Sequence, residues 1–272
     1  QILTGDLEKI RSFYMNRGYL DFDIENTTVS ISETKKNVYI AIIIDEGDKY
    51  NFGDIRISGK FYPLKEESIF QNDIKTIKGE VFSRKLLNQS TESINQELGN
   101  YGYAFSNVNP IPDVDKTNLT VGFNYFIEPG KKVYVRRISF IGNEKTQDKV
   151  LRREMRQFES SYYDKEKIDQ STRRLKRTQY FEGVDIKTVS VPGISDQVDL
   201  TVAVKEKNTG SVKLGAGASS DEGLVGSFSI TQANFLGTGN TISATINTSS
   251  VNKVFSISHL DPYFTLDGIS RR

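Results

Sequence analysis

The residue types that most often carry enzyme chemistry are scarce in this chain. His259 is the only histidine, and none of the 272 residues is a cysteine. A histidine-based metal cluster, a second histidine for acid–base catalysis and a thiol nucleophile are therefore all excluded. His259 stands beside Leu260 in an alternating segment, where a polar position on a β-strand is a better interpretation than a catalytic role. The sequence predicts no catalytic residue, no metal site and no cofactor.

Two other patterns could suggest a ligand site, and each has a plainer structural explanation. Gly-x-Gly spacings occur at residues 215–217 and 237–239. Neither opens a helical pattern or completes a dinucleotide-binding fingerprint, so the glycines are interpreted as places where strands approach, bend or turn. Asp221 and Glu222 stand in a turn-like spacer, which favours solvated turn residues over an acid–base pair.

The charge balance argues against a polyanionic partner. Thirty-six basic and 35 acidic residues give a formal net charge of +1, so nucleic-acid binding is not indicated. The arginines at residues 152–156 and 173–177 are interleaved with acids, which is typical of a solvated helix face. No apolar run reaches the roughly 18 residues of a membrane-spanning helix. The first residues lack a charged segment followed by an apolar core, so an internal or processed segment is expected.

The C-terminal residues 210–272 have a periodic pattern of their own. Apolar and polar residues alternate there with a period of two, which predicts strands. The polar positions of these strands hold Ser, Thr, Asn and Gly with few charges. This composition suits the strands of an outer-membrane barrel, which have an apolar outer face and a polar, water-filled interior. By periodicity alone, the edge of a soluble β-sandwich fits nearly as well. The predicted strands are residues 211–220, 226–235, 241–249 and 253–260.

The preceding residues contain a unit that recurs at about 80 residues. Strands at 50–59 and 134–142 open the second and third copies, and both end at a glycine. Longer helices are expected after Ser83 and Asp164, which are good N-cap types. Short helices are expected from two apolar stripes at i, i+4 and i+7, namely Phe70, Ile74 and Ile77, and Leu151, Met155 and Phe158.

Each copy closes with an apolar, β-branched strand that is expected at the centre of its sheet. These strands are residues 39–44, 119–127 and 198–204. The first copy lacks the opening strand and the first helix, so residues 1–47 are expected to be the C-terminal part of a domain.

Several stretches resemble the BamA family of outer-membrane protein assembly factors, part of the Omp85 superfamily. They are VLRREMRQFE at 150–159, VPGISDQVDL at 191–200, VKEKNTGS at 204–211, QANFLGTGN at 232–240 and DPYFTLDGISRR at 261–272. The likeness runs the whole length. The later barrel strands and the inward loop of the family are absent.

The resemblance implies α+β POTRA repeats (β-α-α-β-β, small mixed three-stranded sheets) followed by the opening antiparallel strands of a transmembrane β-barrel. The implied domains are the C-terminal part of a POTRA domain, two complete POTRA domains and the first barrel strands, at residues 1–47, 48–130, 131–207 and 208–272.

The implied function is assembly and insertion of β-barrel proteins into the bacterial outer membrane, with the POTRA domains in the periplasm. The implied partners are unfolded outer-membrane protein clients, periplasmic chaperones, outer-membrane lipid and accessory lipoproteins, including one on the last POTRA domain. Alternatives are a TamA-like factor or two-partner secretion transporter of the same superfamily, and a soluble β-rich adhesin or scaffold.

Binding sites are expected where strands have unpaired edges, because an exposed edge can pair with a further strand. Open edges are expected at residues 24–32, 108–114 and 184–191, of which the second contains two prolines and the third ends at Pro192. The first edge has no proline and is the predicted client-strand site, with Ile24, Asn26, Thr28, Val29 and Ile31. The predicted barrel gate strand contains Gly210, Ser211, Val212, Leu214, Gly215 and Gly217. The predicted accessory-subunit docking site contains Arg152, Arg153, Arg156 and Glu159.

Overall fold

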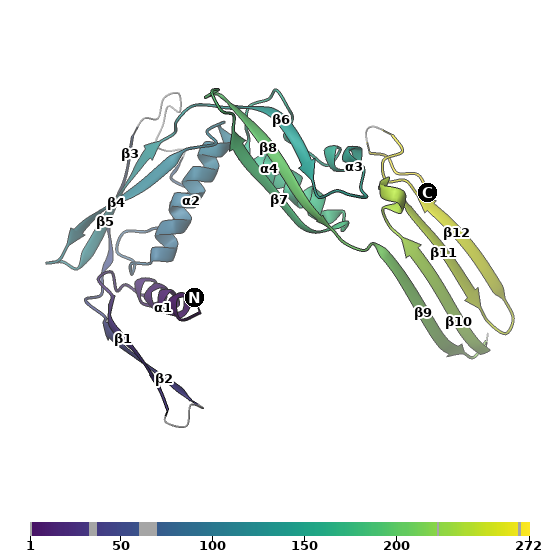
Figure 1. The fold of residues 1–272 in the computed structure, drawn as a ribbon, viewed down its shortest axis with the longest axis horizontal. Helices are drawn as coiled ribbons and strands as arrows, with labels where there is room; N and C mark the ends of the chain where they lie inside the picture. The colour runs from purple at the N-terminus through teal and green to yellow at the C-terminus, as the bar shows by residue number, and fades with distance from the viewer. Residues whose placement is uncertain (1, 33–36, 60–69, 222, 266–267) are drawn as a thin grey trace. The chain divides into compact units, whose positions relative to one another are not determined.

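The computed structural model describes residues 2–32, 37–59, 70–221, 223–265 and 268–272 (Figure 1). The chain divides into two compact units, Gln1–Lys131 and Lys132–Arg272. Among the described residues, no helix combines the length and the apolar character needed to cross a membrane.

The first unit contains a helix with a two-stranded sheet, followed by a three-stranded sheet with a long helix. The first part consists of α1 (Ile2–Met15), β1 (Asp23–Ile31) and β2 (Val38–Asp45). The second part consists of β3 (Asn51–Gly59), α2 (Arg84–Asn100), β4 (Asn107–Asp115) and β5 (Thr120–Glu128). In the second part, β5 lies between the other strands, parallel to β3 and antiparallel to β4.

The core of the three-stranded sheet forms where β5 and α2 bury apolar side chains. Val121, Tyr125 and Ile127 of β5 and Ile94 and Leu98 of α2 are completely buried. Because β5 is covered by strands on both sides and by packed side chains, its apolar composition is explained. The central position predicted for this strand is confirmed.

The second unit contains a three-stranded sheet of the same order, then a four-stranded sheet. The first part consists of β6 (Tyr134–Ile141), α3 (Asp148–Arg152), α4 (Lys165–Arg177), β7 (Phe181–Ser190) and β8 (Gln197–Glu206), with β8 in the centre. The second part is an antiparallel meander of β9 (Gly210–Ser219), β10 (Gly223–Gln232), β11 (Thr241–Thr248) and β12 (Lys253–Leu260), with a short 3₁₀ helix, η2 (Phe235–Gly237), between β10 and β11.

The two short helices predicted at residues 70–77 and 151–158 are wrong over most of their length. α3 ends at Arg152, and the described residues after position 70 form a turn and an irregular segment. Ile77 is 57% exposed and Phe158 is 63% exposed, so neither completes the expected buried stripe.

Buried polar side chains explain why the second of these helices stops early. The Gln157 amide nitrogen donates to the carbonyl oxygen of Tyr162 at 2.9 Å, and its oxygen accepts from the backbone N–H of Asp164 at 2.9 Å. A side chain that satisfies backbone groups in this way stabilises a turn in place of helix. Met155 and Glu154 are buried beside it, although Glu154 was expected on a solvated face.

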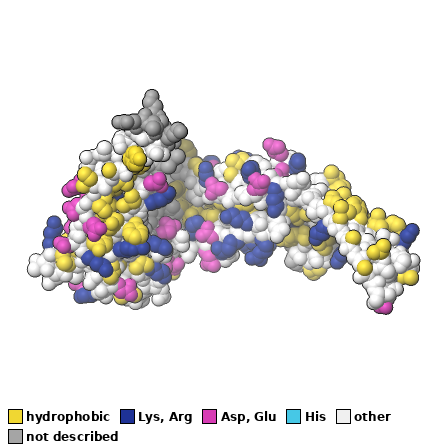
Figure 2. All heavy atoms as spheres, turned by 90° about the horizontal axis from the view of Figure 1, so that it is seen from below, with side chains coloured by type: hydrophobic (Ala, Val, Ile, Leu, Met, Phe, Trp, Pro, Cys, Tyr) yellow, Lys and Arg dark blue, Asp and Glu magenta, His cyan; other side chains and the backbone are white. Residues whose placement is uncertain are grey.

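The alternation predicted for the C-terminal strands separates one apolar face from one polar face. The apolar face exposes eight large side chains, Val212, Leu214, Leu224, Phe228, Ile230, Ile246, Phe255 and Ile257. In the view of Figure 2, apolar side chains lie along these strands and charged ones are sparse. An exposed apolar surface of this kind marks a contact with a partner or a membrane.

The turn between β10 and β11 packs closely on the segment before α3. The Asn234 amide donates to the Thr146 hydroxyl at 2.8 Å, and the Gln147 N–H donates to the carbonyl oxygen of Gly237 at 3.0 Å. A Cβ on Gly237 would overlap the carbonyl oxygen of Lys145, and its φ of +72° is already unfavourable for other residues. This junction therefore requires glycine at position 237.

We expect Gly237→Ala to destabilise the second unit more than Gly193→Ala. Gly193 has a similar φ of +78° but open space around it. Alanine there should lower the free energy of unfolding only by the roughly 1–2 kcal/mol that a left-handed backbone conformation costs. At position 237 the backbone overlap should raise the loss to about 3 kcal/mol or more. Urea unfolding, followed by the near-UV circular dichroism of the tyrosines, measures the free energy of unfolding of both variants. Equal losses would contradict the close packing around Gly237.

Candidate strand-pairing sites

The opening strand of each complete three-stranded sheet is covered at its start by another segment of the same chain. The Phe52 N–H on β3 donates to the carbonyl oxygen of Glu80 at 2.7 Å, and the Val135 N–H on β6 donates to that of Ser161 at 2.9 Å. A short segment of the same chain thus covers the first residues of both outer edges. Among the described strands, β1, β2, β4, β7, β9 and β12 also pair on one side only, and the edges of β1, β4, β7 and β9 include those predicted to pair with another chain.

The open edge of β1 contains three residues whose backbone groups point away from β2. The Ser32 N–H donates to the carbonyl oxygen of Asn37 at 2.9 Å, which makes this a hydrogen-bonded pair. Along an antiparallel ladder, hydrogen-bonded residue pairs alternate with pairs whose backbone N–H and carbonyl groups point away from the neighbouring strand. It follows that Thr27, Val29 and Ile31 direct their N–H and carbonyl groups outward.

The predicted client-strand residues all lie on or beside this strand, but only two of them have outward backbone groups. Val29 and Ile31 are exposed and point to the open edge. Asn26 and Thr28 are paired with β2, in register with Ile43 and Ala41, and Ile24 borders a β-bulge. Sequence alone could not resolve this difference, because the backbone alternation depends on the register.

The edges of β4 and β7 differ in their proline content. Pro110 and Pro112 lie two apart on β4, and because proline has no N–H it must occupy the outward positions of an edge strand. On β7 the Val191 N–H donates to Gln197 at 3.4 Å, so the outward residues are Val184, Ile186, Thr188 and Ser190. The β4 edge is therefore blunted, and the β7 edge retains its donors.

β9 is the first strand of the four-stranded sheet and pairs with β10 on one side only. The Ala233 N–H donates to the carbonyl oxygen of Thr209 at 3.3 Å, which fixes the alternation along the ladder. The outward positions are consequently Gly210, Val212, Leu214, Ala216 and Ala218. The Gly210 N–H is already occupied by the side-chain oxygen of Asn208 at 3.0 Å.

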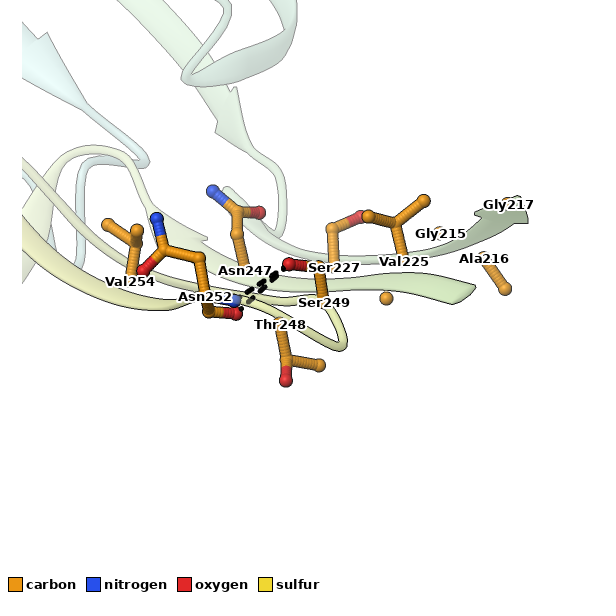
Figure 3. A pocket seen from close by; sticks show the side chains of 11 residues that line it. Gly215, Ala216, Gly217, Val225, Ser227, Asn247, Thr248, Ser249, Asn252 and Val254 are labelled. Carbon is orange, nitrogen blue, oxygen red and sulfur yellow. Dashed lines mark hydrogen bonds between the residues drawn. The ribbon is translucent and has the colours of Figure 1, made fainter. Parts of the chain in front are cut away.

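All six residues predicted for the gate strand lie in β9 and are exposed. Ser211, Gly215 and Gly217 direct their backbone groups toward β10, whereas Val212 and Leu214 direct theirs outward. Gly215 and Gly217 border a hollow of about 440 Å³ on the polar face, into which Ser227 and Asn247 project (Figure 3). Because the glycines carry no side chains, much of this part of β9 is held mainly by its backbone.

The predicted docking residues do not form one surface. Arg152 and Glu159 form an ion pair at 3.3 Å, and Glu159 also accepts from the Ile138 N–H at 2.8 Å. The Ile138 N–H and then Arg152 hold the pKa of Glu159 below its usual range. Arg153 points elsewhere, with its guanidinium 4.2 Å from the ring centroid of Tyr263. The expected set of four exposed charges is thus only partly present.

A buried carboxylate that sequence reasoning placed on the surface connects the three-stranded sheet unit to the C-terminal segment. Glu154 accepts from Arg174 at 2.8 Å, and the same arginine donates to the hydroxyl of Tyr263 at 2.8 Å. The Tyr180 hydroxyl donates to the carbonyl oxygen of Gly239 at 3.0 Å, and burial raises the pKa of Tyr180. The run of charges around Glu154 gave no signal of this burial.

Known protein families contain the same repeated unit. A family model for POTRA, described as surface antigen variable number repeat, matches residues 1–47, 50–130 and 133–207. The chain belongs to the POTRA family. Its three POTRA matches cover the two complete three-stranded sheets and the two-stranded sheet of β1 and β2.

The POTRA chain is similar to outer membrane protein assembly factor BamA. It is 37% identical to BamA of Neisseria meningitidis serogroup B over 99% of this chain and 34% of that protein. It also matches the crystal structure of Haemophilus ducreyi BamA lacking POTRA domains 1–3, with 35% identity, a TM-score of 0.72 and coverage of 81% of this chain and 41% of that one. Haemophilus influenzae BamA POTRA3–5 matches with 31% identity, a TM-score of 0.70 and coverage of 75% and 80%. The chain thus spans about a third of the length of the curated relative.

Proposed function

We propose that this chain is part of an outer-membrane protein assembly factor that inserts β-barrel proteins by exchanging backbone hydrogen bonds between strands. Residues 1–47 are the C-terminal part of a POTRA domain, residues 48–130 and 131–207 are complete POTRA domains in the periplasm, and residues 208–272 are the first strands of a β-barrel in the outer membrane. The similarity to proteins named as assembly factors supports this role.

The observation that carries the proposal is the outward edge of β9. Val212, Leu214, Ala216 and Ala218 combine outward backbone groups with small or apolar side chains on one face. In lipid each unsatisfied backbone group costs several kcal/mol, so this edge needs a partner strand. A client β-strand meets that need without a particular client sequence and without covalent chemistry.

A photocrosslinking residue at Leu214 tests this assignment. In the full-length protein, we expect Leu214 to capture the last strand of a stalled client. Position 259 on β12, in place of His259, serves as the control, because it lies on the opposite end of the described sheet. Equal capture at both positions, or none at Leu214, would contradict a specific role for β9.

The β1 edge is the proposed periplasmic site for unfolded clients, which chaperones deliver. We expect Val29→Pro to weaken strand addition at this edge about tenfold, because it removes an outward donor and places a ring against the guest strand. Thr28→Pro is the matched control for folding, because it breaks the β1–β2 ladder. Titration with a client peptide measures binding, and circular dichroism measures the β-sheet content of each variant. Val29→Pro should keep the sheet and lose binding, whereas Thr28→Pro should lose the sheet. Unchanged binding would remove β1 as a client site.

The surface around the ion-paired Arg152 and Glu159 is the proposed docking site for an accessory lipoprotein. We expect Glu159→Lys to abolish co-purification of the lipoprotein but also to destabilise the unit by about 1–3 kcal/mol, because the Ile138 N–H loses its acceptor. Glu159→Gln retains an acceptor and removes the charge, so it should weaken co-purification with little change in the melting temperature. If both variants retain the lipoprotein, the site is elsewhere.

A further inference from the structure

A small cavity in the second unit is unusually rich in arginine. It measures about 270 Å³ and lies between α4, the end of α3 and the segment after β12. Its lining includes Arg153, Glu154, Arg174, Arg177, Tyr180 and Tyr263. Three guanidinium groups therefore face one cavity together with a single carboxylate.

The carboxylate does not neutralise this charge. Glu154 accepts from Arg174 at 2.8 Å and forms a longer ion pair with the Nε of Arg153 at 4.0 Å, so this one carboxylate is shared by two guanidinium groups. Arg177 forms no ion pair with any residue that the structure describes. The Nε atoms of Arg153 and Arg174 are buried and have no hydrogen-bond acceptor among the described residues. One carboxylate is thus set against three guanidinium groups, which leaves the cavity with an excess of positive charge.

We propose that this cavity binds one phosphate group, supplied by the head group of an anionic phospholipid. Guanidinium groups match phosphate oxygens in charge and in the spacing of their donors. The cavity is slightly smaller than the roughly 300–1,000 Å³ of typical small-molecule sites, which suits one phosphate and not a nucleotide.

Exposed apolar side chains next to the cavity favour a lipid over a free phosphate ion. Tyr180 also lines a second hollow, whose rim includes Phe235 and Leu236, and Leu236 is 76% exposed. Phe264 and Ile269 are exposed in the segment that follows Tyr263. Acyl chains can contact these residues while the head group enters the cavity. Only the lipid source rests on the proposed membrane position of β9–β12.

Binding of short-chain lipids to the full-length protein in non-ionic detergent tests the site. We expect saturable binding of dihexanoylphosphatidylglycerol at least about tenfold tighter than that of dihexanoylphosphatidylcholine, and tighter than that of inorganic phosphate. Arg177→Gln should weaken binding about tenfold, because it removes a cation from the cavity. Arg173→Gln, one turn earlier on α4 and outside the lining of the cavity, should change it less than about twofold.

Two results would overturn the inference. Equal weakening by Arg173→Gln and Arg177→Gln would show diffuse attraction to the helix surface and no site. Inorganic phosphate binding as tightly as phosphatidylglycerol would overturn the lipid as the source and assign the cavity to a free anion. No client is present in this experiment, so its failure is distinguishable from failure of the proposed assembly function.

Discussion

Glu154→Gln is expected to lower the free energy of unfolding of the second unit by about 2–3 kcal/mol. Glu154 is 6% exposed and accepts from Arg174, which also holds Tyr263. Breaking a buried ion pair typically costs about 3–5 kcal/mol, and the partial exposure of Arg174 places the expected loss at or just below the lower limit of this range. The junction between the POTRA fold and the C-terminal segment should loosen first.

Urea unfolding followed by tyrosine circular dichroism measures this loss. Asp185→Asn is the matched control, because Asp185 and Lys187 form an exposed pair at 4.0 Å, for which less than about 1 kcal/mol is expected. Equal effects of the two substitutions would contradict the structural role of Glu154. The same Glu154→Gln protein should bind phosphatidylglycerol more tightly, since the cavity loses its only carboxylate.

Ala216→Pro is expected to lower client crosslinking to β9 by about tenfold or more while leaving the four-stranded sheet intact. The Ala216 N–H points outward, so its loss does not affect the ladder with β10. A guest strand, however, would lose one donor and meet the proline ring, and in lipid its unpaired carbonyl costs several kcal/mol.

Gly215→Pro provides the control for this substitution. The Gly215 N–H points toward Ser227 on β10, so proline there should break the ladder and lower the stability of the sheet itself. Heat-modifiable gel mobility and crosslinking of the full-length protein separate the two outcomes. Client crosslinking that survives Ala216→Pro would argue against backbone pairing at this edge.

Much of the architecture was predictable from periodicity. The four C-terminal strands match the predicted ones within a few residues, because alternation with a period of two needs no tertiary information. The longer helices begin after Ser83 and Asp164 as expected, and Asp164 accepts from the Lys167 N–H. The apolar closing strands occupy the centre of both three-stranded sheets.

The errors arise where polar side chains are buried. The stripe of Leu151, Met155 and Phe158 fits a helix, but Gln157 satisfies a turn and leaves Phe158 exposed. Glu154 stands among arginines, as on a solvated face, yet it is buried against Arg174. The Gln157 contacts are local but depend on a turn that apolar periodicity does not report, and the Glu154–Arg174 pair joins two separate helical segments. For the same reason the outward residues of each edge required the observed register.

The most direct test of the account is amide hydrogen exchange along β9 in the full-length protein, with and without a stalled client. The amides of Val212, Leu214, Ala216 and Ala218 should exchange rapidly when free and become protected on engagement. Those of Lys213, Gly215 and Gly217 should be protected in both states, because they bond to β10. Protection that rises equally in both sets, or in neither, would contradict strand pairing at this edge.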